Sequence, residues 1–98
     1  MLIRSQDKER VVNTAACGEI AVHQGYKEDE RFYVSAYFYE DRITLGGYDS
    51  KERAKEVLHD IILYESLMKA IELRIDASDT DVTAFEDMLF GCYDMPAE

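Results

Sequence analysis

Residues 45–71 constrain the fold most, because they join the end of an apolar run to a long helical pattern. Gly46 and Gly47 follow Leu45, and glycines can adopt the positive φ angles that a sharp strand exit often needs. Ser50 is a suitable N-cap, since its hydroxyl can accept a hydrogen bond from a free N–H of the first helical turn. The pattern predicts a helix over residues 50–73 with one face on a core. The apolar positions of that face are Ala54, Val57, Leu58, Ile61, Tyr64, Met68 and Ile71.

The half of the chain before this helix has the pattern of a sheet. Residues 19–24 alternate between apolar and polar side chains, and residues 32–40 are dense in aromatic and β-branched types. A charged loop at 25–31 and a turn at 40–42 separate these segments from each other and from residues 43–48, while shorter apolar patches occur at 2–3 and 11–12. The 98 residues therefore predict one α+β domain, in which an antiparallel meander of about four strands packs against the long helix.

The C-terminal part predicts two further elements. Residues 74–78 break the helical pattern, and the polar run that follows offers several N-caps for a short acidic helix over 79–87. Residues 88–94 are either the continuation of that helix or a final strand that returns to the sheet. Pro96 extends neither a helix nor a central strand.

The charge of the chain is strongly acidic, with a net charge of −10 and a pI near 4.5. Residues 74–98 hold seven acids and one base, whereas residues 1–73 hold fourteen acids and ten bases. Long-range repulsion disfavours direct binding to nucleic acid or to an anionic membrane, and the same field attracts a basic surface. The alternative is that the acidity serves only solubility.

No pattern of catalytic or metal-binding residues emerges from the sequence. A calcium loop that begins at Asp79 would have Ala84 where glycine is needed and Phe90 where glutamate is needed. Two histidines, His23 and His59, lack neighbours at ligand spacing, and the two cysteines belong to no CxxC motif. We therefore expect no metal, no cofactor and no enzymatic activity, with both thiols free in the cytoplasm.

Tyrosines line one side of the expected strand at 32–40. Tyr33, Tyr37 and Tyr39 superficially resemble the stacking aromatic residues of an RNA-binding strand, but the glycine of that pattern is missing and the net charge has the wrong sign. Two interpretations remain. The rings are covered by another element of the fold, or they line a protein contact, where tyrosine is enriched.

Three segments of the sequence form a recognisable set: residues 2–8 (LIRSQDK), residues 45–48 with the following ERAKEVL at 52–58, and residues 93–96 (YDMP). Together they resemble a family of small proteins from Gram-positive bacteria and their phages. The resemblance implies a cytoplasmic protein of mobile-element origin whose last strand ends in Met95-Pro96. It favours the strand alternative for residues 89–94, and it leaves the acidic segment before that strand without a counterpart.

Among these observations, the acidic segment is the strongest functional candidate. Fixed carboxylates can imitate nucleic-acid phosphates and occupy a Lys/Arg groove, as small phage-encoded anti-CRISPR and anti-restriction proteins do. The expected partner is a basic nucleic-acid-binding protein such as a CRISPR effector or a restriction enzyme. The alternative is a housekeeping interaction module, homodimeric through a sheet edge. The candidate partner-binding residues are Asp76, Asp79, Asp81, Glu86, Asp87, Glu28, Asp29, Glu30, Tyr33, Tyr37 and Tyr39.

Overall fold

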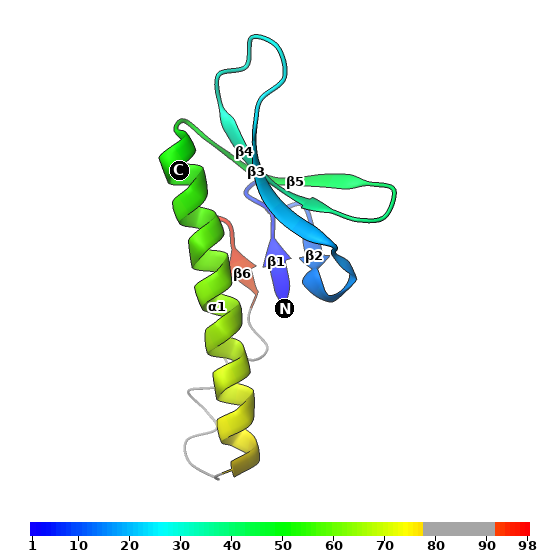
Figure 1. Cartoon of the computed structure of the whole chain (residues 1–98), viewed down its shortest axis with the longest axis vertical. Coiled ribbons are helices and arrows are strands. Elements are labelled where there is room, and N and C mark those ends of the chain that lie inside the picture. Colours follow the sequence, from blue (N-terminus) through cyan, green and yellow to red (C-terminus); the bar gives the residue numbers. More distant parts are fainter. Residues whose placement is uncertain (78–91) are drawn as a thin grey trace.

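The computed structural model describes residues 1–77 and 92–98, with side chains for residues 1–70 and 92–98 (Figure 1). The predicted short acidic helix at 79–87 and the first half of the predicted strand at 89–94 lie outside the described residues. The elements, in chain order, are β1 (Leu2–Arg4), β2 (Val11–Asn13), a 3-10 turn η1 (Thr14–Ala16), β3 (Glu19–Gln24), β4 (Phe32–Tyr37), β5 (Arg42–Tyr48), α1 (Lys51–Ala77) and β6 (Tyr93–Asp94).

The strands form two small sheets, which confirms the α+β class and corrects the four-stranded meander. The meander has three strands, in the order β3-β4-β5, and all its pairs are antiparallel. The second sheet has the order β2-β1-β6, in which β1 pairs antiparallel with β2 and parallel with β6. The first two strands leave the meander because they form their own short hairpin, whose free edge at β1 is taken by the C-terminal strand.

The limits of the strands follow local signals closely, with one exception. Strand β3 and the loop at 25–31 have the predicted bounds, but β4 ends at Tyr37 instead of residue 40. The reason is a tight turn that starts earlier than expected, since the Phe38 N–H donates to the Asp41 carbonyl at 2.7 Å. Tyr39 therefore belongs to a loop and not to the sheet.

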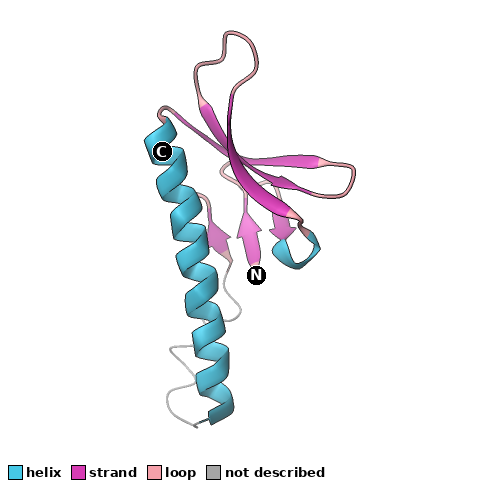
Figure 2. Cartoon of the chain, in the orientation of Figure 1, coloured by secondary structure: helices cyan, strands magenta, loops and turns pink. Residues whose placement is uncertain are grey.

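Helix α1 covers one face of the meander. Ser50 caps it as predicted, because its Oγ accepts a hydrogen bond from the Arg53 N–H at 3.1 Å. Ala54, Val57 and Ile61 are buried in the same core as residues of β4 and β5, but Leu58 is only half-buried, which corrects its predicted place in the core. The C-terminal part of α1 extends past the strands (Figure 2). Within the described residues, no helix is long and apolar enough to cross a bilayer.

Gly46 and Gly47 lie inside β5, and the structure corrects the reason given for them. None of the described glycines has a positive φ. What position 47 requires is space, since a Cβ there would lie 2.7 Å from Cε1 of Tyr33 on the neighbouring strand. At position 46 a Cβ would lie 2.8 Å from the Tyr48 hydroxyl. The adjacent Leu45 is the extra residue of a β-bulge, and its carbonyl accepts a hydrogen bond from the Gln6 N–H at 2.7 Å.

Candidate binding face on the three-stranded sheet

The face of the β3-β4-β5 sheet that points away from α1 carries the predicted tyrosines. Side chains alternate along β4, so Val34 and Ala36 enter the core beneath α1 while Tyr33 and Tyr37 project from the opposite face, half-buried. Helix α1 therefore does not cover these two rings. We call this surface the outer face. Its strand residues are Glu19, Ala21, His23, Tyr33, Ser35, Tyr37, Arg42, Thr44 and Gly47.

The β3–β4 loop, residues 25–31, is closed by its own hydrogen bonds. The Gly25 N–H donates to the Arg31 carbonyl at 2.8 Å, and the Arg31 N–H donates to Asp29 Oδ1 at 3.0 Å. The Tyr33 hydroxyl donates to the other carboxylate oxygen of Asp29. This hydrogen bond is the main cause that lowers the pKa of Asp29 and raises the pKa of Tyr33. Asp29 and Tyr33 are thus partners of each other, and they hold the loop against the sheet.

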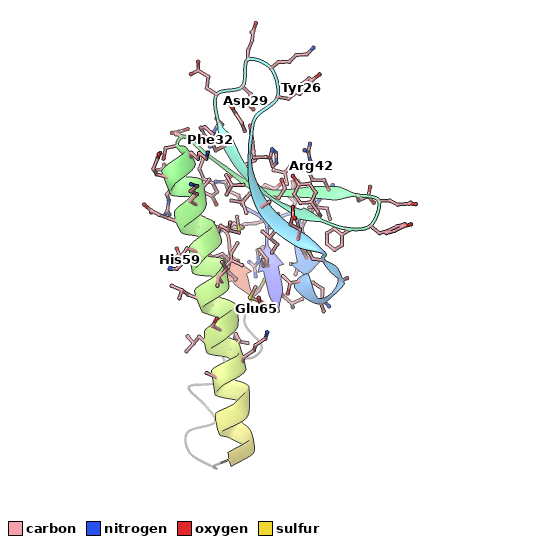
Figure 3. The ribbon with its side chains drawn as sticks, viewed as in Figure 1. Tyr26, Asp29, Phe32, Arg42, His59 and Glu65 are labelled. Carbon is pink, nitrogen blue, oxygen red and sulfur yellow. The ribbon has the colours of Figure 1, made fainter. Side chains whose placement is uncertain are left out.

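The two loops of the meander share one chemistry, an exposed tyrosine beside exposed carboxylates. In the β3–β4 loop, Tyr26 is 83% exposed and points outward (Figure 3), and Glu28 and Glu30 are exposed on the same loop. In the β4–β5 loop, residues 38–41, Tyr39 is 99% exposed and is followed by two exposed acids. Sequence reasoning missed Tyr26 because the charge run beside it dominates the loop. An aromatic residue within a polar hairpin loop is the signal that identifies it.

A concave pocket of about 350 Å³ lies on the outer face, beside the β3–β4 loop. Two cations contribute to its wall, Lys27 from the loop and Arg42 from β5. Neither forms a salt bridge with a described residue. The full lining is His23, Gln24, Gly25, Tyr26, Lys27, Tyr33, Arg42 and Thr44.

His23 and Ser35 form the contact on this face that most resembles a catalytic pair. His23 Nε2 lies 2.7 Å from Ser35 Oγ, and Nδ1 lies 3.2 Å from the Gln24 carbonyl. A carbonyl only accepts, so in the neutral ring Nδ1 carries the proton and Nε2 accepts from the serine hydroxyl. Ser35 is completely buried, so its oxygen has no access to a substrate. The arrangement fixes the histidine ring, which also stacks on Tyr33 at a centroid distance of 5.8 Å.

The remaining reactive side chains are dispersed. Cys17 and Cys92 are free and half-buried, and burial raises the pKa of the Cys92 thiol, which disfavours the nucleophilic thiolate. His59 lies on the exposed side of α1 (Figure 3). Among the residues for which side chains are described, no three of the histidine, cysteine and acidic types gather as metal ligands.

The structure places only part of the predicted acidic segment. Asp76 belongs to the last turns of α1, beyond the residues whose side chains are described. Asp79, Asp81, Glu86 and Asp87 lie outside the described residues altogether. The site can therefore be built from the outer face and its two loops, to which the other six predicted residues belong.

Comparison with known protein families, characterised proteins and solved structures gives no match to this chain. The class of protein that the fold and the site define is a small acidic α+β domain whose described sheet bears tyrosines on the face opposite helix α1.

Proposed function

We propose that this chain is a non-catalytic, cytoplasmic binding domain that docks on the basic surface of a nucleic-acid-binding protein. The observation that supports the proposal best is the presence of Tyr26 and Tyr39, 83% and 99% exposed, on two loops that also present carboxylates. Exposed tyrosines are candidates for binding hot spots. When a partner binds, a tyrosine buries a large rigid area and keeps a hydroxyl that can form a hydrogen bond. Carboxylates beside them favour a partner surface rich in Lys and Arg.

The spacing of the two loops defines the size of the contact. They lie at opposite ends of β4, whose six residues span roughly 20 Å at the usual rise of a strand. A partner that touches both loops must therefore present a surface at least that wide. A standard interface of about 800 Å² per partner is large enough.

A nucleic-acid-binding groove fits these requirements better than a flat basic patch. Carboxylates that replace phosphates in such a groove gain the same salt-dependent attraction that drives DNA or RNA binding. Residues 74–98 are rich in acids, and their negative charge adds to the attraction between the chain and a basic groove. We propose that the partner is a host defence protein, such as a CRISPR effector or a restriction enzyme, and that the domain acts as a phage-type inhibitor.

A capture experiment tests the proposal directly. The chain is immobilised and exposed to a lysate of a bacterium that carries CRISPR and restriction systems, in parallel with a Tyr26→Ala/Tyr39→Ala variant. Ile62→Ala is the control, because Ile62 is a large apolar side chain on α1 that is also exposed, at 54%. We expect a nucleic-acid-binding protein to be retained by the original chain and the control and lost from the double variant. Equal retention by all three chains contradicts the proposal.

One observation favours a second candidate, a homodimeric interaction module. Strand β3 is an edge strand that pairs only with β4 in the described sheet, and its sequence EIAVHQ has no proline, lysine or bulge to protect the edge. Sedimentation of the original chain and of an Ala21→Lys variant distinguishes the candidates, because Ala21 faces away from the core on β3. A dimer that dissociates in the variant supports the module.

A further inference from the structure

We propose that the pocket on the outer face is a binding site for a small phosphate monoester that carries a planar ring, such as a nucleoside monophosphate. The pocket shares Tyr26 and the β3–β4 loop with the proposed docking surface, but the inference rests on other residues of its wall, chiefly Lys27 and Arg42. Its volume of about 350 Å³ lies within the range of small-molecule pockets, near the lower limit.

The charge of the ligand follows from two cations of the pocket wall that form no salt bridge with a described residue. Lys27 Nζ instead lies over the ring of Tyr26, 5.4 Å from its centroid. Arg4, Arg31, Arg53 and Lys69 each form a salt bridge with a carboxylate. Lys27 and Arg42 form none with a described residue, although the chain has 21 acids and only 11 bases.

These two cations come from different elements, the β3–β4 loop and β5, and both line the same pocket. The pocket wall therefore carries two cations, although the protein as a whole is acidic. Two cations on one wall match the charge of a phosphate monoester, which is about −1.5 to −2 at neutral pH.

Asp29, a carboxylate on the same loop as Lys27, forms no salt bridge with either cation. Asp29 accepts hydrogen bonds from the Tyr33 hydroxyl and from the Arg31 N–H, and both of its oxygens are used in this way. Arg31 itself is occupied, because its Nε lies 3.4 Å from Asp49 and its Nη2 donates to the Gly47 carbonyl at 2.7 Å. Lys27 and Arg42 are therefore the two cations of the pocket lining that no described carboxylate holds in a salt bridge.

The planar ring is inferred from the rest of the lining. His23 and Tyr33 stack on each other and form an aromatic wall, and both nitrogens of the histidine ring are already engaged. This wall offers ring edges and faces but few free hydrogen-bonding groups. A ligand with an aromatic ring matches it better than a sugar phosphate does.

Position 27 allows the role of the cation to be separated from the role of the backbone. Lys27 has a φ of 59°, in the left-handed region that glycine adopts without strain. A purely structural role would make glycine at least as good as lysine at this position. The substitution Lys27→Gly therefore removes the cation while relieving the backbone.

The experiment is a titration of the full chain at low ionic strength, followed by amide NMR shifts and calorimetry. The probes are AMP, adenosine, which lacks the phosphate, and inorganic phosphate, which lacks the ring. We expect AMP to bind at least tenfold more tightly than either fragment, with the largest shifts in residues 23–27 and 42–44. Lys27→Gly and Arg42→Gln should each weaken AMP binding at least fivefold, with an unchanged or higher melting temperature for Lys27→Gly.

The matched controls are Lys51→Gln and Lys55→Gln, which remove exposed cations from α1 outside the pocket and should leave AMP affinity unchanged. Three results would overturn the site. They are AMP affinity no higher than that of phosphate or adenosine, AMP affinity unchanged in both pocket variants, and an equal loss in the α1 controls. None of these variants alters Tyr26 or Tyr39, so failure here leaves the protein-docking proposal to its own test.

Discussion

Gln6 and Gly47 exchange two hydrogen bonds across the boundary between the two sheets. The Gly47 N–H donates to Gln6 Oε1 at 2.9 Å, and Gln6 Nε2 donates to the Gly47 carbonyl at 3.1 Å. The side-chain amide thus replaces a neighbouring strand at the edge of β5. The same Nε2 also lies 3.0 Å from the Pro96 carbonyl and 2.8 Å from the Ala97 carbonyl, so one side chain joins the β1–β2 hairpin loop, β5 and the C-terminal tail.

Replacing Gln6 with alanine should destabilise the fold by roughly 2–3 kcal/mol. The variant leaves the buried Gly47 N–H without its acceptor and removes the contacts of the amide with the C-terminal tail, while the Gly47 carbonyl keeps only its hydrogen bond from Arg31. Urea unfolding measures the free energy. Gln24→Ala is the control, because Gln24 is exposed, and it should change stability by less than about 0.5 kcal/mol. If Gln6→Ala and Gln24→Ala lower the free energy of unfolding equally, the Gln6 side-chain amide does not hold the two sheets together.

The contact between Gly47 and Tyr33 makes a second prediction. Gly47→Ala should cost about 1–3 kcal/mol, because its Cβ would lie 2.7 Å from the Tyr33 ring and the ring can move only by weakening its hydrogen bond to Asp29. In a Tyr33→Ala background the same substitution should cost clearly less, which a double-mutant cycle detects.

Gly18→Ala is the control for this cycle, since a Cβ at position 18 would meet only the Tyr37 carbonyl at an ordinary 3.6 Å. It should be neutral or slightly stabilising. If the stability losses of Gly47→Ala and Tyr33→Ala simply add in the double variant, close packing against Tyr33 is not the reason for glycine at position 47.

Tyr48 should make the fold sensitive to alkali. Burial is the main cause that raises its pKa to about 12, and its hydroxyl donates to the Pro96 carbonyl at 2.9 Å. In the unfolded chain a tyrosine has a pKa of about 10. Between pH 10 and 12 the unfolded state releases this proton and the folded state keeps it, so the free energy of unfolding falls as pH rises.

The Tyr48→Phe variant should cost about 1 kcal/mol at pH 8, where the hydroxyl contributes only its hydrogen bond. It should also lose less stability than the original chain between pH 10 and 12, by an amount on the order of 2 kcal/mol. Urea midpoints at pH 8, 10 and 11.5 measure both effects. Parallel pH profiles for the two chains would show that Tyr48 does not titrate as its burial requires.

The two faces of α1 should respond differently to truncation. Ile61 is 3% exposed and packs in the core, so Ile61→Ala should cost about 2–4 kcal/mol through lost burial and a cavity. Leu58 is half-buried, and Leu58→Ala should cost only about 1–2 kcal/mol. Thermal and urea unfolding give the two values. If Leu58→Ala lowers stability more than Ile61→Ala does, the helix packs against the sheet through a different face.

Local patterns predicted the meander well, because its signals lie within a few residues of one another. The alternation over β3, the charged loop after it and the Ser50 cap are all short-range features, and the structure confirms each. The second sheet could not be predicted in this way. It pairs Ile3 with Tyr93, at opposite ends of the chain, through strands of two or three residues that carry little periodicity.

The candidate site was predictable in composition but not in geometry. The strand alternation places Tyr33 and Tyr37 on one face, but it does not show which face the helix covers. The alternation also does not show that Asp29 accepts a hydrogen bond from Tyr33, since this contact depends on how the loop closes. The pocket between Lys27 and Arg42 depends on two residues fifteen positions apart, and neither has a motif around it.

The measurement that tests the proposed docking most directly is a displacement titration. A fluorescently labelled DNA or RNA is bound to the captured partner, and the chain is added while fluorescence anisotropy is recorded. We expect the anisotropy to fall to the value of the free nucleic acid, with an affinity that weakens steeply as salt is raised. A variant with its loop acids neutralised should need a much higher concentration, chiefly through slower association. Its substitutions are Glu28→Gln, Glu30→Gln, Glu40→Gln and Asp41→Asn. A partner that holds the chain and its nucleic acid together, and binds the neutralised variant equally well, would contradict the account.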